Sequence, residues 1–175
     1  MRRILSSENA IRPEKRKGSP VAVDRTHAAR IAEDYKDSIP FARVEELLGV
    51  GGKIARKLAI SGLLPIWIPG GRMGKKHRYV IRRRELDAWV DALVGDAPTL
   101  PALPPDCLTL AEAPLRRNIP VTVLVDAVRS GKIRIIGTLQ GHPRFGGAVV
   151  FDADVAAARS DEILARTGTT RSGPP

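Results

Sequence analysis

The sequence has 175 residues, of which 43% are apolar and only 4% aromatic, so it can form one ordinary domain or two small ones around a core of Val, Leu, Ile and Ala. Lys and Arg number 29 against 19 Asp and Glu, and this net charge of +10 favours a polyanionic partner, either nucleic acid or an anionic membrane surface. No apolar run reaches the roughly 18 residues of a membrane span, the first residues lack a signal-peptide core, and the single cysteine, Cys107, excludes an internal disulfide.

The two ends of the chain differ in composition from the region between them. Residues 1–20 are polar and basic and residues 167–175 are rich in Gly and polar residues, so we expect both tails to be disordered. Residues 21–37 carry apolar side chains at helical spacing, which predicts an N-terminal helix. Its apolar positions are Ala28, Ile31, Ala32 and Tyr35.

Residues 38–93 form the first predicted folded unit, which begins with a short amphipathic helix. We expect this helix to start near Ser38 as its N-cap and to end at the glycines of Gly49–Gly52, because glycine admits the positive φ of a tight turn. The apolar positions of the helix are Phe41, Val44, Leu47 and Leu48.

A second helix is predicted from Lys53 to Ile60, with Ile54 and Leu58 on one face. Gly62 fits the position at which a helix ends in a left-handed conformation. The Ser61-Gly62 pair is therefore interpreted as a helix stop.

The rest of the first unit predicts a β-hairpin followed by a third helix. Residues 66–68 and 77–81 have the composition of strands, and residues 69–76 between them form a Gly-rich, basic loop. A helix from about Arg83 follows, and residues 94–106, with four prolines, predict an extended linker. The apolar face of this helix consists of Leu86, Trp89, Val90 and Leu93, and we expect both Trp67 and Trp89 to be core residues rather than platforms for base stacking.

Residues 107–166 repeat this order with an offset of 69 positions and no gap. Ser130-Gly131 repeats Ser61-Gly62, and apolar positions match in type over about fifty residues, which indicates a duplicated structural unit. The predicted elements are a helix from Leu110, a break at Asn118–Pro120, a helix over Val121–Ser130, a strand over Ile133–Thr138, a loop over residues 140–147, a strand over Ala148–Phe151 and a helix over Asp154–Ala165.

Helix, turn, helix, strand, wing, strand and helix is the order of a winged helix-turn-helix. We therefore predict a mainly α fold with small β-hairpin wings (α+β), built from two tandem winged helix-turn-helix units related by the 69-residue repeat. The run VEELLGVGGKIARKLAISGLLP followed by RYVIRRRELDAWV resembles the winged unit of MerR-type regulators and phage excisionases. Together with the second unit, it resembles the C-terminal part of TniQ-family transposition target-selection proteins, although the zinc-ribbon cysteines of that family are absent.

Positive charge is concentrated in the first unit, which makes it the better candidate for contacting a phosphate backbone. Residues 38–92 contain 11 Lys/Arg against 5 Asp/Glu, whereas residues 107–158 contain 6 against 4. On the second helix, Arg56 is the best candidate for reading a base edge, because a guanidinium can bind guanine bidentately. The predicted DNA-binding residues are Lys53, Arg56 and Lys57 on the helix, Arg72, Lys75, Lys76 and Arg78 on the wing, and Arg82 and Arg83 after it.

Two alternatives stay open for the charged residues that follow the wing and for the second unit. The basic run at residues 82–84 either completes the phosphate contacts or pairs with Glu85 and Asp87. The second unit has Asp126 where the first has Lys57, and an acid there repels phosphates, so this unit either makes weak DNA contacts or serves as a protein-docking or supporting module. Phe145 is either exposed or folded beneath the hairpin. The candidate contact residues of the second unit are Arg116, Arg117, Thr122, Arg129, His142 and Arg144.

The sequence has no motif of an enzyme and no metal-ligand spacing, so we expect neither catalysis, cofactor nor metal. The expected partner is double-stranded DNA in the cytoplasm, at the nucleoid, with recombinase, transposase or RNA polymerase components as further partners and no membrane. The expected function is sequence-specific DNA binding in recombination, excision or transposition of a mobile element. A transcriptional regulator of the same fold and a protein-docking scaffold are the alternatives.

Overall fold

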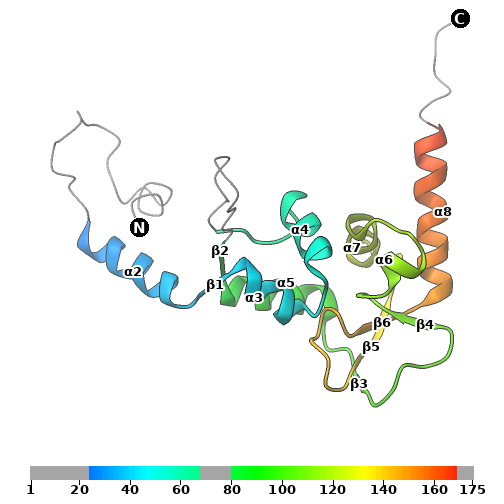
Figure 1. Ribbon diagram of the computed structural model, residues 1–175, viewed down its shortest axis with the longest axis horizontal. Coiled ribbons are helices and arrows are strands. Elements are labelled where there is room, and N and C mark those ends of the chain that lie inside the picture. Colours follow the sequence, from blue (N-terminus) through cyan, green and yellow to red (C-terminus); the bar gives the residue numbers. More distant parts are fainter. Residues whose placement is uncertain (1–23, 68–79, 169–175) are drawn as a thin grey trace, which may run out of the picture.

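The computed structural model describes residues 24–67 and 80–168, and within them the fold is mixed α+β with seven helices and two small sheets (Figure 1). The helices are α2 (Arg25–Lys36), α3 (Phe41–Leu48), α4 (Gly52–Ile60), α5 (Arg83–Val94), α6 (Ala113–Arg116), α7 (Val121–Arg129) and α8 (Asp152–Gly168). The strands are β1 (Ser38–Pro40), β2 (Val80–Arg82), β3 (Thr99–Leu100), β4 (Cys107–Thr109), β5 (Ile135–Leu139) and β6 (Ala148–Phe151).

Each of the two sheets contains an antiparallel ladder, and the two ladders pair residues at equivalent positions of the 69-residue repeat. In the two-stranded sheet, β1 and β2 are antiparallel with Ile39 opposite Ile81. In the four-stranded sheet, whose order is β3-β5-β6-β4, the antiparallel strands β4 and β6 place Leu108 opposite Val150. Every residue pair of the first ladder lies 69 positions before a residue pair of the second.

The Ser-Gly stops end α4 and α7 in the same way, as predicted. Gly62 and Gly131 have φ of 73° and 74°, a left-handed conformation that glycine adopts without the steric cost of a side chain. The hydroxyls of Ser61 and Ser130 each donate to a carbonyl three residues earlier, at 3.1 and 3.2 Å.

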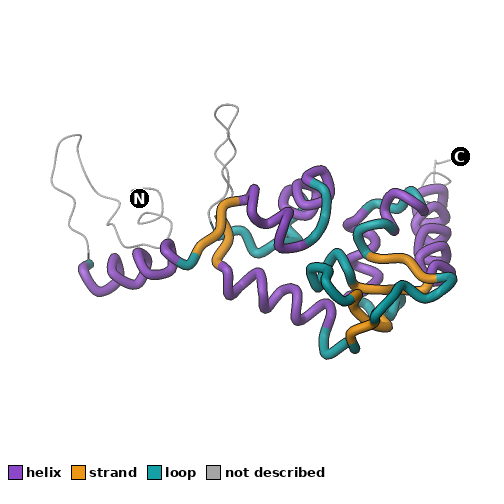
Figure 2. The backbone as a smooth tube through the Cα atoms, turned by 60° about the horizontal axis from the view of Figure 1, so that its bottom comes forward, coloured by secondary structure: helices purple, strands orange, loops and turns teal. Residues whose placement is uncertain are grey.

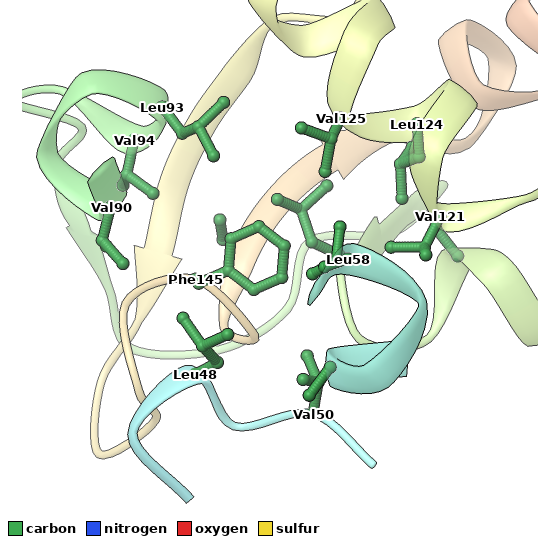
Figure 3. Packing of buried hydrophobic residues seen from close by; sticks show 14 of the residues in the cluster. Leu48, Val50, Leu58, Val90, Leu93, Val94, Val121, Leu124, Val125 and Phe145 are labelled. Atoms are coloured by element: carbon green, nitrogen blue, oxygen red, sulfur yellow. The ribbon is translucent and has the colours of Figure 1, made fainter. Parts of the chain in front are cut away.

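One hydrophobic core contains residues from both halves of the chain. The helices α4 and α7 pack against each other. Figure 3 shows Phe145, from the loop before β6, among Leu48 of α3, Leu58 of α4 and Val90 of α5. Phe145 is 1% exposed, and its ring centroid lies 5.2 Å from that of Trp89. The alternative in which Phe145 is folded beneath the hairpin is therefore the observed one.

Two backbone segments approach closely at the junction between the halves. The amide of Gly146 donates to the carbonyl of Leu48 at 2.7 Å. A Cβ on Gly146 would lie 2.3 Å from the carbonyl oxygen of Gly49, and a Cβ on Gly49 would lie 2.8 Å from Pro143. Both positions require glycine, because a side chain at either would overlap the facing segment.

The starts of the first helices differ from the prediction. Ser38 does not cap a helix but begins β1, and its hydroxyl donates to the carbonyl of Tyr35 at 2.7 Å. The helix α3 begins only at Phe41, without a side-chain cap. The helix expected from Leu110 is the short α6, because the amide of Leu110 continues the sheet by donating to Ala148.

The proline-rich segment 94–106 is extended but is not a free linker. Its residues Thr99 and Leu100 form β3, which pairs in parallel with β5 at the edge of the four-stranded sheet. The carbonyl of Pro98 accepts from Thr138 at 2.8 Å. The segment is therefore part of the sheet, which fixes its path between α5 and β4.

Most of the remaining elements are of the predicted type but begin or end at other residues than predicted. The helix α2 begins with Asp24 as N-cap and buries Ile31; it lies apart from the four-stranded sheet (Figure 2). Ile66 and Trp67 are not in a strand, the predicted loop 69–76 lies outside the described residues, and so do residues 1–20 and 169–175. In the described ranges, no helix is long and apolar enough to cross a membrane.

Candidate nucleic-acid interface

The exposed side of α4 carries a row of basic side chains. Lys53, Arg56 and Lys57 are all exposed, whereas Ala55 and Leu58, on the other side of the helix, are fully buried. The alternation follows from the helical repeat, since positions three and four apart share a face. These three predicted DNA-binding residues therefore point away from the core.

The side chains of Lys53, Arg56 and Lys57 are accessible to a ligand. Within the described part of the chain, none of the three side chains has an ion pair or hydrogen bond. Gly51 and Gly52 begin the helix, and a Cβ on Gly51 would meet nothing within 4 Å. At Gly52, the first residue of α4, a Cβ would lie 2.7 Å from Oε1 of Glu45, so the carboxylate of Glu45 already lies at the N-terminal end of the helix, where partial positive charge accumulates.

The basic run at residues 82–84 is paired with carboxylates of the same chain. Arg82 is 16% exposed in its side chain and pairs with Asp34 of α2 at 3.2 Å and with Glu85 at 3.1 Å. Arg84 pairs with the other oxygen of Asp34, at 3.1 Å. Arg83 pairs with Asp87 at 2.9 Å. Of the two alternatives, intramolecular pairing is the observed one, so we leave Arg82 and Arg83 out of the candidate interface.

Asp34 and Trp67 join α2 to the two-stranded sheet through contacts that the sequence did not indicate. The guanidinium of Arg82 lies 4.3 Å from the centroid of the Trp67 ring, which also meets Tyr35 at 6.4 Å between centroids. These contacts fix α2 against β2. Trp67 is half-buried in this cluster rather than in the main core, whereas Trp89 is buried as predicted.

The predicted wing cations Arg72, Lys75, Lys76 and Arg78 lie outside the described residues. The structure does describe both ends of this segment. The amide of Trp67 donates to the carbonyl of Val80 at 3.0 Å. That bond holds the two ends together beside the N-terminal end of α5.

The helix α7 has no counterpart to the basic row of α4. Val125 occupies the position of Arg56 and is 1% exposed, and Asp126 occupies the position of Lys57. The face that points outward in α4 is therefore partly used for packing in α7. Thr122, at the position of Lys53, is half-buried.

The remaining candidates of the second unit fall into two groups. Arg117 pairs with Asp152, and Arg144 pairs with Asp91 of α5 and donates to the carbonyl of Gly95 at 2.7 Å. Both arginines thus make contacts inside the protein, and Arg144 links the two halves. Arg116, Arg129 and His142 are exposed, as is the paired Arg144, and the structure adds the exposed Arg134 to these candidates.

The second unit also carries a groove between α7 and α8 of about 390 Å³, lined by Val123, Ala127 and Ala158 with Asp126 and Glu162 at its edge. In the first unit, the positions of the two alanines hold Leu58 and Trp89.

Chemically reactive groups are few in the described ranges. No group of three His, Cys, Asp or Glu side chains is placed there to hold a metal ion. Cys107 is buried in β4, and burial, helped by the charge of Asp106, raises the pKa of its thiol.

Neither a family model, nor a curated protein, nor a solved structure matches the chain.

Proposed function

We propose that the protein binds duplex DNA sequence-specifically through α4, in the recombination, excision or transposition of a mobile element. The observation that carries the proposal is the row of Lys53, Arg56 and Lys57, which is exposed and has no ion pair or hydrogen bond among the residues that the structure describes, on a chain of net charge +10. Several other arginines of the chain are paired with carboxylates, among them Arg82 and Arg144. A basic helix face without acidic partners suits the major groove and its flanking phosphates.

The architecture we propose is a pair of winged helix-turn-helix units that arose by duplication, as in MerR-type regulators, excisionases and TniQ-family proteins. Supporting it are the order of the elements, the common register of the β1/β2 and β4/β6 ladders, and the matching Ser-Gly stops of α4 and α7. In such a unit, α3 and α4 are the helix-turn-helix and α4 is the recognition helix.

The second unit, in this proposal, supports the first rather than reading DNA. Phe145 packs on Trp89, Arg144 pairs with Asp91, and Gly146 bonds to the turn after α3. These contacts would hold α4 in a fixed orientation, which lowers the entropic cost of binding.

Two other functions make different predictions. A transcriptional regulator would use the same α4 contacts, but its bound sites in the genome would lie at promoters rather than at the ends of mobile elements. A protein-docking scaffold would bind its partner with little dependence on salt, whereas DNA binding through several Lys and Arg weakens steeply as salt rises. The groove between α7 and α8 is the observation that favours a docking role for the second unit.

Salt-dependent binding of the full chain to a fluorescent duplex tests the proposal. The double variant Lys53→Ala/Lys57→Ala should bind more weakly, and its slope of log affinity against log salt should be lower by about 0.9 for each lysine that bonded a phosphate. The matched control is Lys36→Ala/Lys132→Ala, which removes the same charge from two exposed lysines paired with Glu33 and Asp161. Equal weakening in the two double variants would mean that net charge, not α4, governs binding.

A further inference from the structure

The basic row of α4 ends in an apolar side chain that the sequence analysis did not single out. Ile60 is 66% exposed and lies four residues after Arg56 and three after Lys57, so it continues the same helix face. The spacing of Lys53, Arg56, Lys57 and Ile60 is that of one continuous stripe.

The side chains at the end of this stripe offer no free hydrogen-bond donor. Ile60 has no donor or acceptor in its side chain, and the hydroxyl of the next residue, Ser61, already donates to the carbonyl of Leu58 at 3.1 Å. Gly62 has no side chain, and a Cβ there would meet nothing within 4 Å. A ligand surface that approaches this end can therefore reach the apolar side chain without obstruction.

On the edges of bases in the major groove, the apolar group is the C5-methyl of thymine. We propose that Ile60 is a specificity-determining residue that contacts this methyl, so that α4 selects a thymine in addition to the guanine read by Arg56. This inference rests on the proposed function, because it takes α4 to be the recognition helix.

The geometry of the helix also sets the spacing between the two bases. Four residues of α-helix rise about 6 Å, and stacked bases are about 3.4 Å apart along a strand. For a helix lying along the groove, the thymine is therefore about two base pairs from the guanine.

The second unit does not offer the same pair of contacts. Its residues at the positions of Arg56 and Ile60 are Val125, which is buried, and Arg129, which is charged. The selection of a thymine methyl is thus assigned to α4 alone of the two helices.

The test replaces the thymine by uracil, which lacks only the methyl group, in the duplex that the full chain selects from a random pool. Removal of one buried methyl group should weaken binding about fourfold. The variant Ile60→Ala should bind the thymine and uracil duplexes equally. The control Leu115→Ala removes an exposed apolar side chain of the second unit, 82% exposed, and should keep the fourfold difference.

The outcomes separate this inference from the function on which it rests. Equal binding of both duplexes by the unchanged protein, with Arg56→Ala still losing preference for its guanine, would overturn the role of Ile60 and leave DNA reading by α4 intact. Failure of the full chain to select any duplex would instead overturn the proposed function. A thymine preference that survives in Ile60→Ala would overturn the inference by assigning the methyl contact to another residue.

Discussion

Val125 of α7 occupies the position that Arg56 has in α4, and one side chain is buried where the other is exposed. The two residues lie 69 positions apart, at equivalent places in helices that both begin nine residues before a Ser-Gly stop. Similar local structure therefore places equivalent residues in different surroundings. The side chain at this position is exposed to solvent in α4 and packs in the core in α7.

Exchange of the side chains at these two positions should change the free energy of unfolding by very different amounts. Val125→Arg places a charge in the core without a partner and should lower the free energy of unfolding by about 3–5 kcal/mol. Arg56→Val changes an exposed site and should alter it by no more than about 0.5 kcal/mol. Urea denaturation followed by circular dichroism measures both. Equal stability losses would mean that α7 is not packed as described.

The junction at Gly146 should not tolerate a side chain. A Cβ there would lie 2.3 Å from the carbonyl oxygen of Gly49, so Gly146→Ala must shift backbone and should cost about 1–3 kcal/mol. The control is Gly51→Ala, where a Cβ meets nothing within 4 Å, and it should stay within about 0.5 kcal/mol of the unchanged protein. If Gly146→Ala is as stable as Gly51→Ala, the two halves do not meet at this point.

The thiol of Cys107 should react slowly in the folded protein. Burial raises its pKa, and the negative charge of Asp106 raises it further, so at pH 8 less thiolate is present than in the unfolded chain. Because the folded pKa is above the unfolded one, the thiol stabilises the fold below the unfolded pKa, and this stabilisation is lost as pH rises through the folded pKa. The rate of reaction with a disulfide reagent, with and without denaturant, measures the effect. A folded rate equal to the denatured rate would contradict burial of β4.

Periodicity predicts the helices well because their apolar faces are regular. The apolar positions of α5, the helix stops and the strand Ala148–Phe151 follow from residues that are adjacent or one helical turn apart. The three-residue strands β1 and β4 are too short to show alternation, so the local sequence favours a helix cap at Ser38, where the structure has a strand.

The candidate site is only partly predictable from the sequence. The exposure of Arg56 follows from its place on α4, whereas the pairing of Arg82 with Asp34 joins residues 48 positions apart and leaves no local signal. Val125 is buried because α7 packs against the other half of the chain. The apolar periodicity within α7 does not predict that contact. Extending the spacing of the basic residues by one turn would have indicated Ile60.

Selection of DNA sites by the full chain and by Arg56→Ala is the most direct test of the central claim that α4 reads DNA. Duplexes enriched from a random pool by each protein would be sequenced, and affinities for the preferred duplex measured by fluorescence anisotropy. We expect the unchanged protein to enrich a site containing a guanine at which Arg56→Ala shows no preference, with a loss of about 1–3 kcal/mol in binding free energy on that site. Enrichment of the same site by both proteins with equal affinity, or of no site by either, would contradict the assignment of α4 as the reading helix.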